Sequence, residues 1–185
     1  MDRLDPSTTV ILVVDVQEKL AAAMPEEALA ALVKNTNILL EAAKALGVRV
    51  LASEQYPKGL GPTLPAIAAN LDALGVKPMA KMTFDACSDL ALARALTDPD
   101  PRAVVVVGME AHVCVFQTAR ELVKRGYATH VVADAVTSRR EDNRRLGLAL
   151  CERAGAFITG TETVAFDLLE RAGTDAFKAV SKLVR

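Results

Sequence analysis

The sequence has few of the residue types that mark disulfide-stapled, zinc-stabilised or nucleic-acid-binding proteins. Tryptophan is absent and aromatic residues make up only 4% of the chain, which leaves little for stacking on bases. The three cysteines are odd in number, widely spaced and without a Cys-x-x-Cys pair, so they suit neither a disulfide framework nor a structural zinc site. The formal net charge of -1 gives no electrostatic reason to expect nucleic acid or an anionic membrane as a partner.

Long apolar runs are missing as well. No apolar stretch approaches the roughly 20 residues needed to cross a bilayer. The polar start, Met1 to Asp5, cannot serve as the apolar core of a signal peptide. We therefore expect a cytoplasmic protein that acts on neither membranes nor nucleic acids. Its 185 residues, 51% apolar and 24% charged, predict one globular domain spanning residues 1–185.

Short β-branched apolar runs alternate with helical patterns along the chain. This alternation predicts an α/β protein with three layers, in which helices cover both faces of an open six-stranded parallel sheet of order 3-2-1-4-5-6. Segment 53–65, with three prolines and two glycines, is expected to be the longest loop. The expected strands are 8–15, 48–52, 76–81 (an edge strand, because of Pro78), 103–107, 128–133 and 156–159, and the expected helices 25–46, 66–74, 90–96, 111–125, 142–154, 161–170 and 174–184.

Polar residues follow the ends of these strands, where parallel sheets bind ligands. Asp15, Lys81 and Cys114 form a chemically complete set among them. A carboxylate can take the proton of a thiol and return it to a leaving group, and a nearby ammonium favours both charged forms. The expected helix begins near Cys114, and a helix N-terminus makes a thiol easier to ionise. These residues predict acyl transfer through a covalent intermediate.

Four segments, in this order, resemble the isochorismatase-like cysteine hydrolases, a family that includes nicotinamidases, N-carbamoylsarcosine amidases and isochorismatases. They are Val13–Gln17, Ala80–Ala86, Gly108–Val115 and Val131–Ala135. The resemblance implies that Asp15 is the general base, Lys81 its electrostatic partner and Cys114 the nucleophile. Segment 54–61 resembles a branch of the family whose substrates are mostly unassigned.

The same resemblance implies further features of the site. The family's unusual cis peptide bond would join Met109 and Glu110, and the N–H groups of Glu110 and Cys114 would form an oxyanion hole. Gln17 would help to shape the substrate pocket. Tyr56, on the loop nearest the expected site, is a candidate substrate contact.

Metal-binding nicotinamidases carry an Asp and two His after the second strand. The only histidines here are His112 and His130, and neither lies in segment 53–65. We therefore expect no metal and no cofactor, and the resemblance argues against nicotinamide as substrate. His112 remains open as a base or an exposed turn residue. Cys87 is expected to be buried or to line the pocket, and Cys151 to be buried.

The sequence thus predicts a hydrolase, with a small amide, carbamoyl compound or related acyl compound as its substrate and a thioester intermediate. The alternative is a catalytically quiet scaffold or interaction protein that keeps the fold. A dinucleotide-binding enzyme is disfavoured because no G-x-G-x-x-G occurs. The family resemblance also implies a homo-oligomer, and segment 174–184 could pack on its own domain or on a partner.

Overall fold

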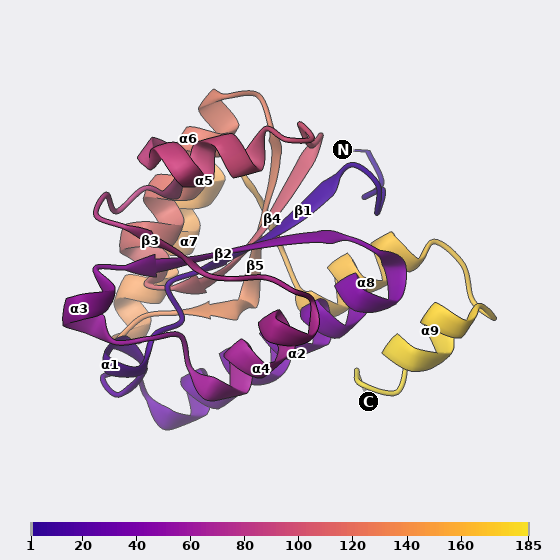
Figure 1. Ribbon diagram of the computed structural model, residues 1–185, viewed down its shortest axis with the longest axis horizontal. Helices are drawn as coiled ribbons and strands as arrows, with labels where there is room; N and C mark the ends of the chain where they lie inside the picture. Colours follow the sequence, from indigo (N-terminus) through magenta and orange to yellow (C-terminus); the bar gives the residue numbers. More distant parts are fainter. Residues whose placement is uncertain (1, 185) are drawn as a thin grey trace.

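A parallel sheet of six strands runs through the molecule (Figure 1). The computed structural model describes residues 2–184. The strand order is β3-β2-β1-β4-β5-β6, and every neighbouring pair is parallel, which confirms the predicted sheet. The strands are β1 (Thr9–Val14), β2 (Arg49–Gln55), β3 (Met79–Lys81), β4 (Ala103–Met109), β5 (Ala128–Thr137) and β6 (Phe157–Thr159).

The central strands β1 and β4 are buried along their whole length. Their continuous runs of valine, isoleucine and leucine suit this position because helices cover both faces of the sheet. In register, Val13 pairs with Val107 and Val14 with Gly108. The carboxyl ends of β1 and β4 therefore lie side by side, and so do the residues that follow them.

Helices cover both faces of the sheet, as the alternation predicted (Figure 1). One apolar cluster joins one face to side chains of α2, α4 and α8, and a second joins the other face to α5, α6 and α7. The bounds are α2 (Glu26–Leu46), α4 (Pro65–Ala73), α5 (Leu90–Leu96), α6 (Phe116–Lys124), α7 (Glu141–Arg153) and α8 (Thr161–Leu169).

The last helix, α9 (Asp175–Val180), packs on its own chain. Val180 is fully buried beside Ala42 of α2 and Ala165 of α8, and the rings of Phe166 and Phe177 meet edge to face. Of the two packing alternatives for segment 174–184, the structure shows packing on its own domain for α9. None of the helices formed by residues 2–184 combines the length and the apolar character that crossing a membrane requires.

Several boundaries differ from the sequence prediction. Segment 53–65 is not one long loop, because β2 continues to Gln55 and a short helix, α3 (Pro57–Leu60), follows. Strand β5 runs on to Thr137, past a shift in its pairing with β4 between Val106 and Gly108. The helix expected from residue 111 starts instead as a π-helical turn, η2 (Ala111–Val115), before α6. Two short elements, α1 (Glu18–Ala21) and the 3-10 turn η1 (Ala86–Ser88), were not expected.

Candidate active site

The sheet order places the ends of β3, β2, β1 and β4 in one row. Lys81 ends β3, Asp15 follows β1, and Cys114 lies in η2 after β4. Lys81 Nζ lies 2.7 Å from Asp15 Oδ2, and both side chains are completely shielded from solvent. Two of the three residues predicted to act together thus form a buried ion pair.

The ammonium of Lys81 is held by more than its charge partner. It donates to Oε1 of Gln55 at 2.8 Å, and to the backbone carbonyls of Thr83 and Phe84, both at 3.1 Å. These acceptors offset much of the cost of removing the charge from water. They also fix the ammonium against the carboxylate of Asp15, with little freedom to leave it.

Asp15 is equally constrained. Its φ of 51° is unusual for a residue other than glycine, although Asp tolerates this region better than most. Its backbone N–H donates to the carbonyl of Ser53 at 3.1 Å, and the Ser53 hydroxyl donates to Oδ1 at 2.7 Å. With Lys81 on Oδ2, each carboxylate oxygen has a buried partner.

Cys114 lies in a setting that keeps its thiol protonated. Only 5% of the residue is exposed, and burial raises the pKa of the thiol to about 12. The nearby carboxylate of Asp15 contributes to this rise by its charge and by hydrogen bonding, while the charge of Lys81 acts against it. The expectation that the helix start makes this thiol easier to ionise stays a prediction, and burial acts against it.

The peptide bond between Met109 and Glu110 is cis. The Glu110 carboxylate is almost completely buried. It accepts hydrogen bonds from two donors of Arg139, the backbone N–H at 3.0 Å and Nε at 3.1 Å. The Glu110 carbonyl accepts from the N–H groups of Val113 and Val115. These two N–H groups are not the ones expected in the oxyanion hole, which belong to Glu110 and Cys114.

Gln17 is fully buried, and its amide is used within the chain. Nε2 donates to the carbonyls of Gln55 and Gly61, and Oε1 accepts from the N–H of Gln55. These contacts tie the segment after β2 to the end of β1, so an influence of Gln17 on the pocket would pass through that segment. Tyr56 is half exposed, and its ring lies against Gly59; its contact with substrate stays a prediction.

The remaining candidates have other partners. His112 Nδ1 lies 3.1 Å from the hydroxyl of Ser138. Cys87 is buried in η1, and burial raises the pKa of its thiol to about 12. Asp134, which belongs to the resembling segment Val131–Ala135, lies within β5 and accepts from the N–H and hydroxyl of Thr161, which starts α8. Among residues 2–184, no three or more His, Cys, Asp or Glu side chains are grouped to hold a metal ion.

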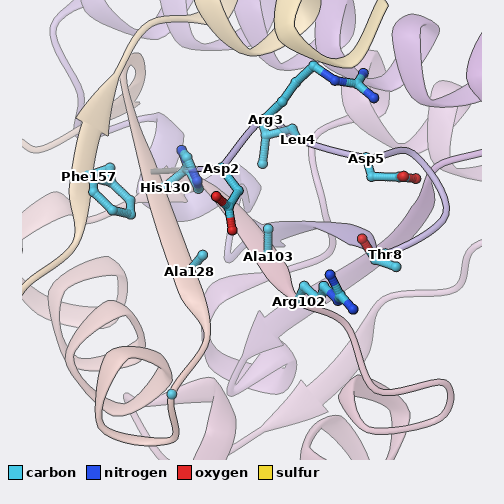
Figure 2. A pocket seen from close by; sticks show the side chains of 11 residues that line it. Asp2, Arg3, Leu4, Asp5, Thr8, Arg102, Ala103, Ala128, His130 and Phe157 are labelled. Carbon is cyan, nitrogen blue, oxygen red and sulfur yellow. The ribbon is translucent and has the colours of Figure 1, made fainter.

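A surface hollow of about 690 Å³ lies at the amino ends of the strands, on the side of the sheet away from the ion pair (Figure 2). It is formed where β1, β4 and β5 begin, with His130, Phe157 and Arg102 among its lining residues. The ion pair and the thiol are at the carboxyl ends of the strands. The hollow therefore lies away from the ion pair, and buried charge and a nucleophile point instead to the row that includes Cys114.

Sequence reasoning missed two residues of this row. Ser53 and Gln55 were expected in a loop, whereas they lie on β2, between Asp15 and Lys81. Their spacing of two residues is the signal that could have found them, because residues i and i+2 of a strand share a face.

Comparisons with known proteins identify the family of the chain. The Isochorismatase domain family matches residues 9–163. The "Secreted isochorismatase effector Isc1" of Phytophthora sojae (strain P6497) is 38% identical over 187 residues, covering 100% of this chain and 88% of that protein. The "Isochorismatase domain-containing protein 2" of Danio rerio is 35% identical over 182 residues, covering 98% and 89%.

Solved structures show the same fold. The "MAR1 Ribonuclease from Caenorhabditis elegans" has a TM-score of 0.91 at 34% identity, covering 99% of this chain and 92% of that one. YcaC from Pseudomonas aeruginosa, solved "with hexane-2,5-diol and covalent acrylamide", has a TM-score of 0.89 at 19% identity and covers 98% and 91%. YcaC from Escherichia coli, described as "an octameric hydrolase of unknown specificity", has a TM-score of 0.87 at 22% identity and covers 98% and 88%. The chain belongs to the isochorismatase-like hydrolase family.

Proposed function

We propose that this protein is a cysteine hydrolase that acts on a small amide, carbamoyl or related acyl compound through a thioester. The observation that carries the proposal is the buried ion pair of Asp15 and Lys81 close to the thiol of Cys114. A fully buried ion pair contributes little net stability over apolar side chains, so a chemical task is a better reason for it.

The reaction would begin with a proton transfer. Because the pKa of the Cys114 thiol is raised to about 12, almost no thiolate exists at neutral pH. The sulfur would attack the carbonyl carbon while its proton passes to Asp15. The C–N bond would then break, with the same proton leaving on the amine. Water would attack the thioester, give a proton to Asp15 and release the acid as the thiol re-forms.

Lys81 would keep Asp15 charged between these transfers. Its ammonium offers three donors and no acceptor, and it is bound to Oδ2. The N–H groups of Glu110 and Cys114 would hold the oxyanion, and Gln17 and Tyr56 would shape the pocket. No cofactor enters this cycle. A chelator should therefore leave the rate unchanged.

Two family relatives bear on partners. The E. coli YcaC is described as octameric, and we propose that this chain also forms a homo-oligomer. The C. elegans protein is called a ribonuclease, which makes RNA a substrate to test. Three arginines between residues 139 and 145 already pair with acidic side chains, which leaves their charge less free for RNA phosphates: Arg139 with Glu110, Arg144 with Glu141 and Arg145 with Asp142. We also propose a cytoplasmic location, although the P. sojae relative is named as secreted.

Acrylamide provides a test that needs no natural substrate. It is itself a small amide with an electrophilic carbon, and we expect it to add to Cys114 at neutral pH, as peptide mass spectrometry would show. Cys114→Ala should abolish both this adduct and hydrolysis in a panel of small amides, carbamoyl compounds and RNA. Cys151→Ala, which removes another buried cysteine on α7, is the matched control and should change neither.

The same experiment separates the enzyme from a catalytically quiet scaffold. A scaffold that retains the fold would show no faster labelling at Cys114 than at Cys87 or Cys151, whose thiols are buried to a similar extent. A folded Cys114→Ala variant that hydrolyses a substrate at the wild-type rate would sink the proposed function.

A further inference from the structure

Two side chains of β2 lie beside the ion pair formed by the proposed base and its ammonium partner. Ser53 and Gln55 project from the same face of the strand because they are two residues apart. The hydroxyl of Ser53 lies 2.7 Å from Asp15 Oδ1, and Gln55 Oε1 lies 2.8 Å from Lys81 Nζ. The row thus holds four buried polar side chains.

The two oxygens of Asp15 are not equivalent. Oδ2 faces the ammonium of Lys81, which has donors only. A proton placed on Oδ2 would therefore face another donor. Oδ1 faces the hydroxyl of Ser53, which can donate a hydrogen bond to a carboxylate and accept one from a carboxylic acid. Of the two oxygens, Oδ1 is the one on which a proton finds an acceptor.

We propose that Ser53 is a positioning residue of this site, whose hydroxyl donates to Oδ1 while Asp15 is charged and accepts from Oδ1 once the Cys114 proton has arrived. This inference rests on the proposed function, in which Asp15 takes that proton. In the step itself, the S–H bond of Cys114 breaks and an O–H bond forms at Oδ1, while the electron pair of the S–H bond stays on the attacking sulfur. The hydroxyl of Ser53 turns and keeps its own hydrogen.

The arrangement predicts a specific effect of removing the hydroxyl. In Ser53→Ala, the charged carboxylate loses the hydroxyl that donates to Oδ1, so its charged form is stabilised less than in the wild type. A higher pH is then needed before Asp15 can accept the proton of Cys114. In a plot of the Cys114 labelling rate against pH, we call the rise on the acid side the acid limb. Its midpoint should move up by about one pH unit, which corresponds to the free energy of one charge-assisted hydrogen bond. Ser53→Thr keeps a hydroxyl and should restore the wild-type limb.

The measurement is the rate of acrylamide addition at Cys114, followed by peptide mass spectrometry from mildly acidic to mildly alkaline pH. Ser138→Ala is the matched control, because it removes another buried hydroxyl that bonds His112 rather than Asp15. A purely structural role for Ser53 would lower the stability of Ser53→Ala and leave the limb in place. If that variant does not fold, Ser53→Cys keeps the volume with a weak donor and must shift the limb in the same direction.

Asp15→Asn separates this inference from the proposed function. If Asp15→Asn keeps the wild-type profile, Asp15 is not the proton acceptor and both ideas fail. If Asp15→Asn loses the reactivity at neutral pH while folded Ser53→Ala or Ser53→Cys keeps the wild-type limb, only the role of Ser53 is overturned. An upward shift that Ser53→Thr reverses, and that Ser138→Ala does not reproduce, supports it.

Discussion

A β-carbon added to Gly108 would lie 2.0 Å from the backbone carbonyl oxygen of Val14. These two residues pair where β1 and β4 lie closest to the site. Val14 immediately precedes Asp15, and Gly108 precedes the cis peptide bond that leads into η2. The absence of a side chain at Gly108 therefore helps to set the distance between the proposed base and the proposed nucleophile.

Gly108→Ala should destabilise the protein and slow labelling of Cys114. The φ of Gly108 is 124°, so an alanine would be strained in addition to meeting Val14. We expect a loss of about 3–5 kcal/mol in the free energy of unfolding, measured by urea denaturation. Gly126→Ala is the control, with a φ of 91° but open space around it, and should cost about 1–2 kcal/mol. Equal losses in the two variants would contradict the close-approach argument.

The sheet could be predicted because most of its strands are short runs of β-branched apolar residues. The continuous apolar runs of β1 and β4 predict strands that are buried on both faces. The helical patterns between the strands predict crossover helices, and therefore a parallel sheet. Asp15, Lys81 and Cys114 could be grouped as candidates because each ends or follows a strand, and parallel strands bring their carboxyl ends to one side of the sheet.

The missed features depend on information that is not local. Ser53 and Gln55 precede a segment rich in proline and glycine, so their strand character comes from pairing with β1 and β3 rather than from composition. The raised pKa of the Cys114 thiol could not be predicted from its place in the chain either. The helix-start rule is local, whereas burial and the charge of Asp15 come from the packed fold.

Asp15→Asn gives opposite expectations for two models of Cys114. The charge of Asp15 raises the pKa of the thiol, so its removal should lower that pKa. If a standing thiolate did the chemistry, the variant would react faster with acrylamide at neutral pH. If Asp15 takes the proton during attack, the variant should react at least about tenfold more slowly, within the range of general-base effects. The ratio of the two labelling rates at neutral pH decides between them.

Lys81→Met should destabilise the protein by about 3–5 kcal/mol, because it leaves the carboxylate of Asp15 buried without its ammonium. The double variant Asp15→Asn with Lys81→Met removes both charges and should be more stable than Lys81→Met alone. A double-mutant cycle of unfolding free energies measures this coupling. Strictly additive losses would mean that the 2.7 Å ion pair contributes nothing specific.

Gly147→Ala tests how α7 holds the turn that carries Cys114. Alanine is the better helix former, so propensity alone predicts a gain of about 1 kcal/mol. A β-carbon at Gly147 would, however, lie 2.5 Å from the carbonyl carbon of Ala111 and 2.6 Å from the backbone nitrogen of His112. We expect lower stability and slower labelling of Cys114, because η2 must move. A stabilised variant with unchanged labelling would show that the turn does not depend on this contact.

His130 should make the protein less stable in mild acid. It is buried, and desolvation lowers its pKa from 6.5, against a smaller opposing effect of the charge of Asp167. Between the lowered pKa and 6.5, the unfolded chain binds a proton that the folded chain does not, so stability falls as pH falls through that window. The slope can reach about 1.4 kcal/mol per pH unit. Urea denaturation at several pH values should show a shallower slope for His130→Leu than for the wild type. If the wild type and His130→Leu lose stability with the same slope, residues other than His130 cause the sensitivity to acid.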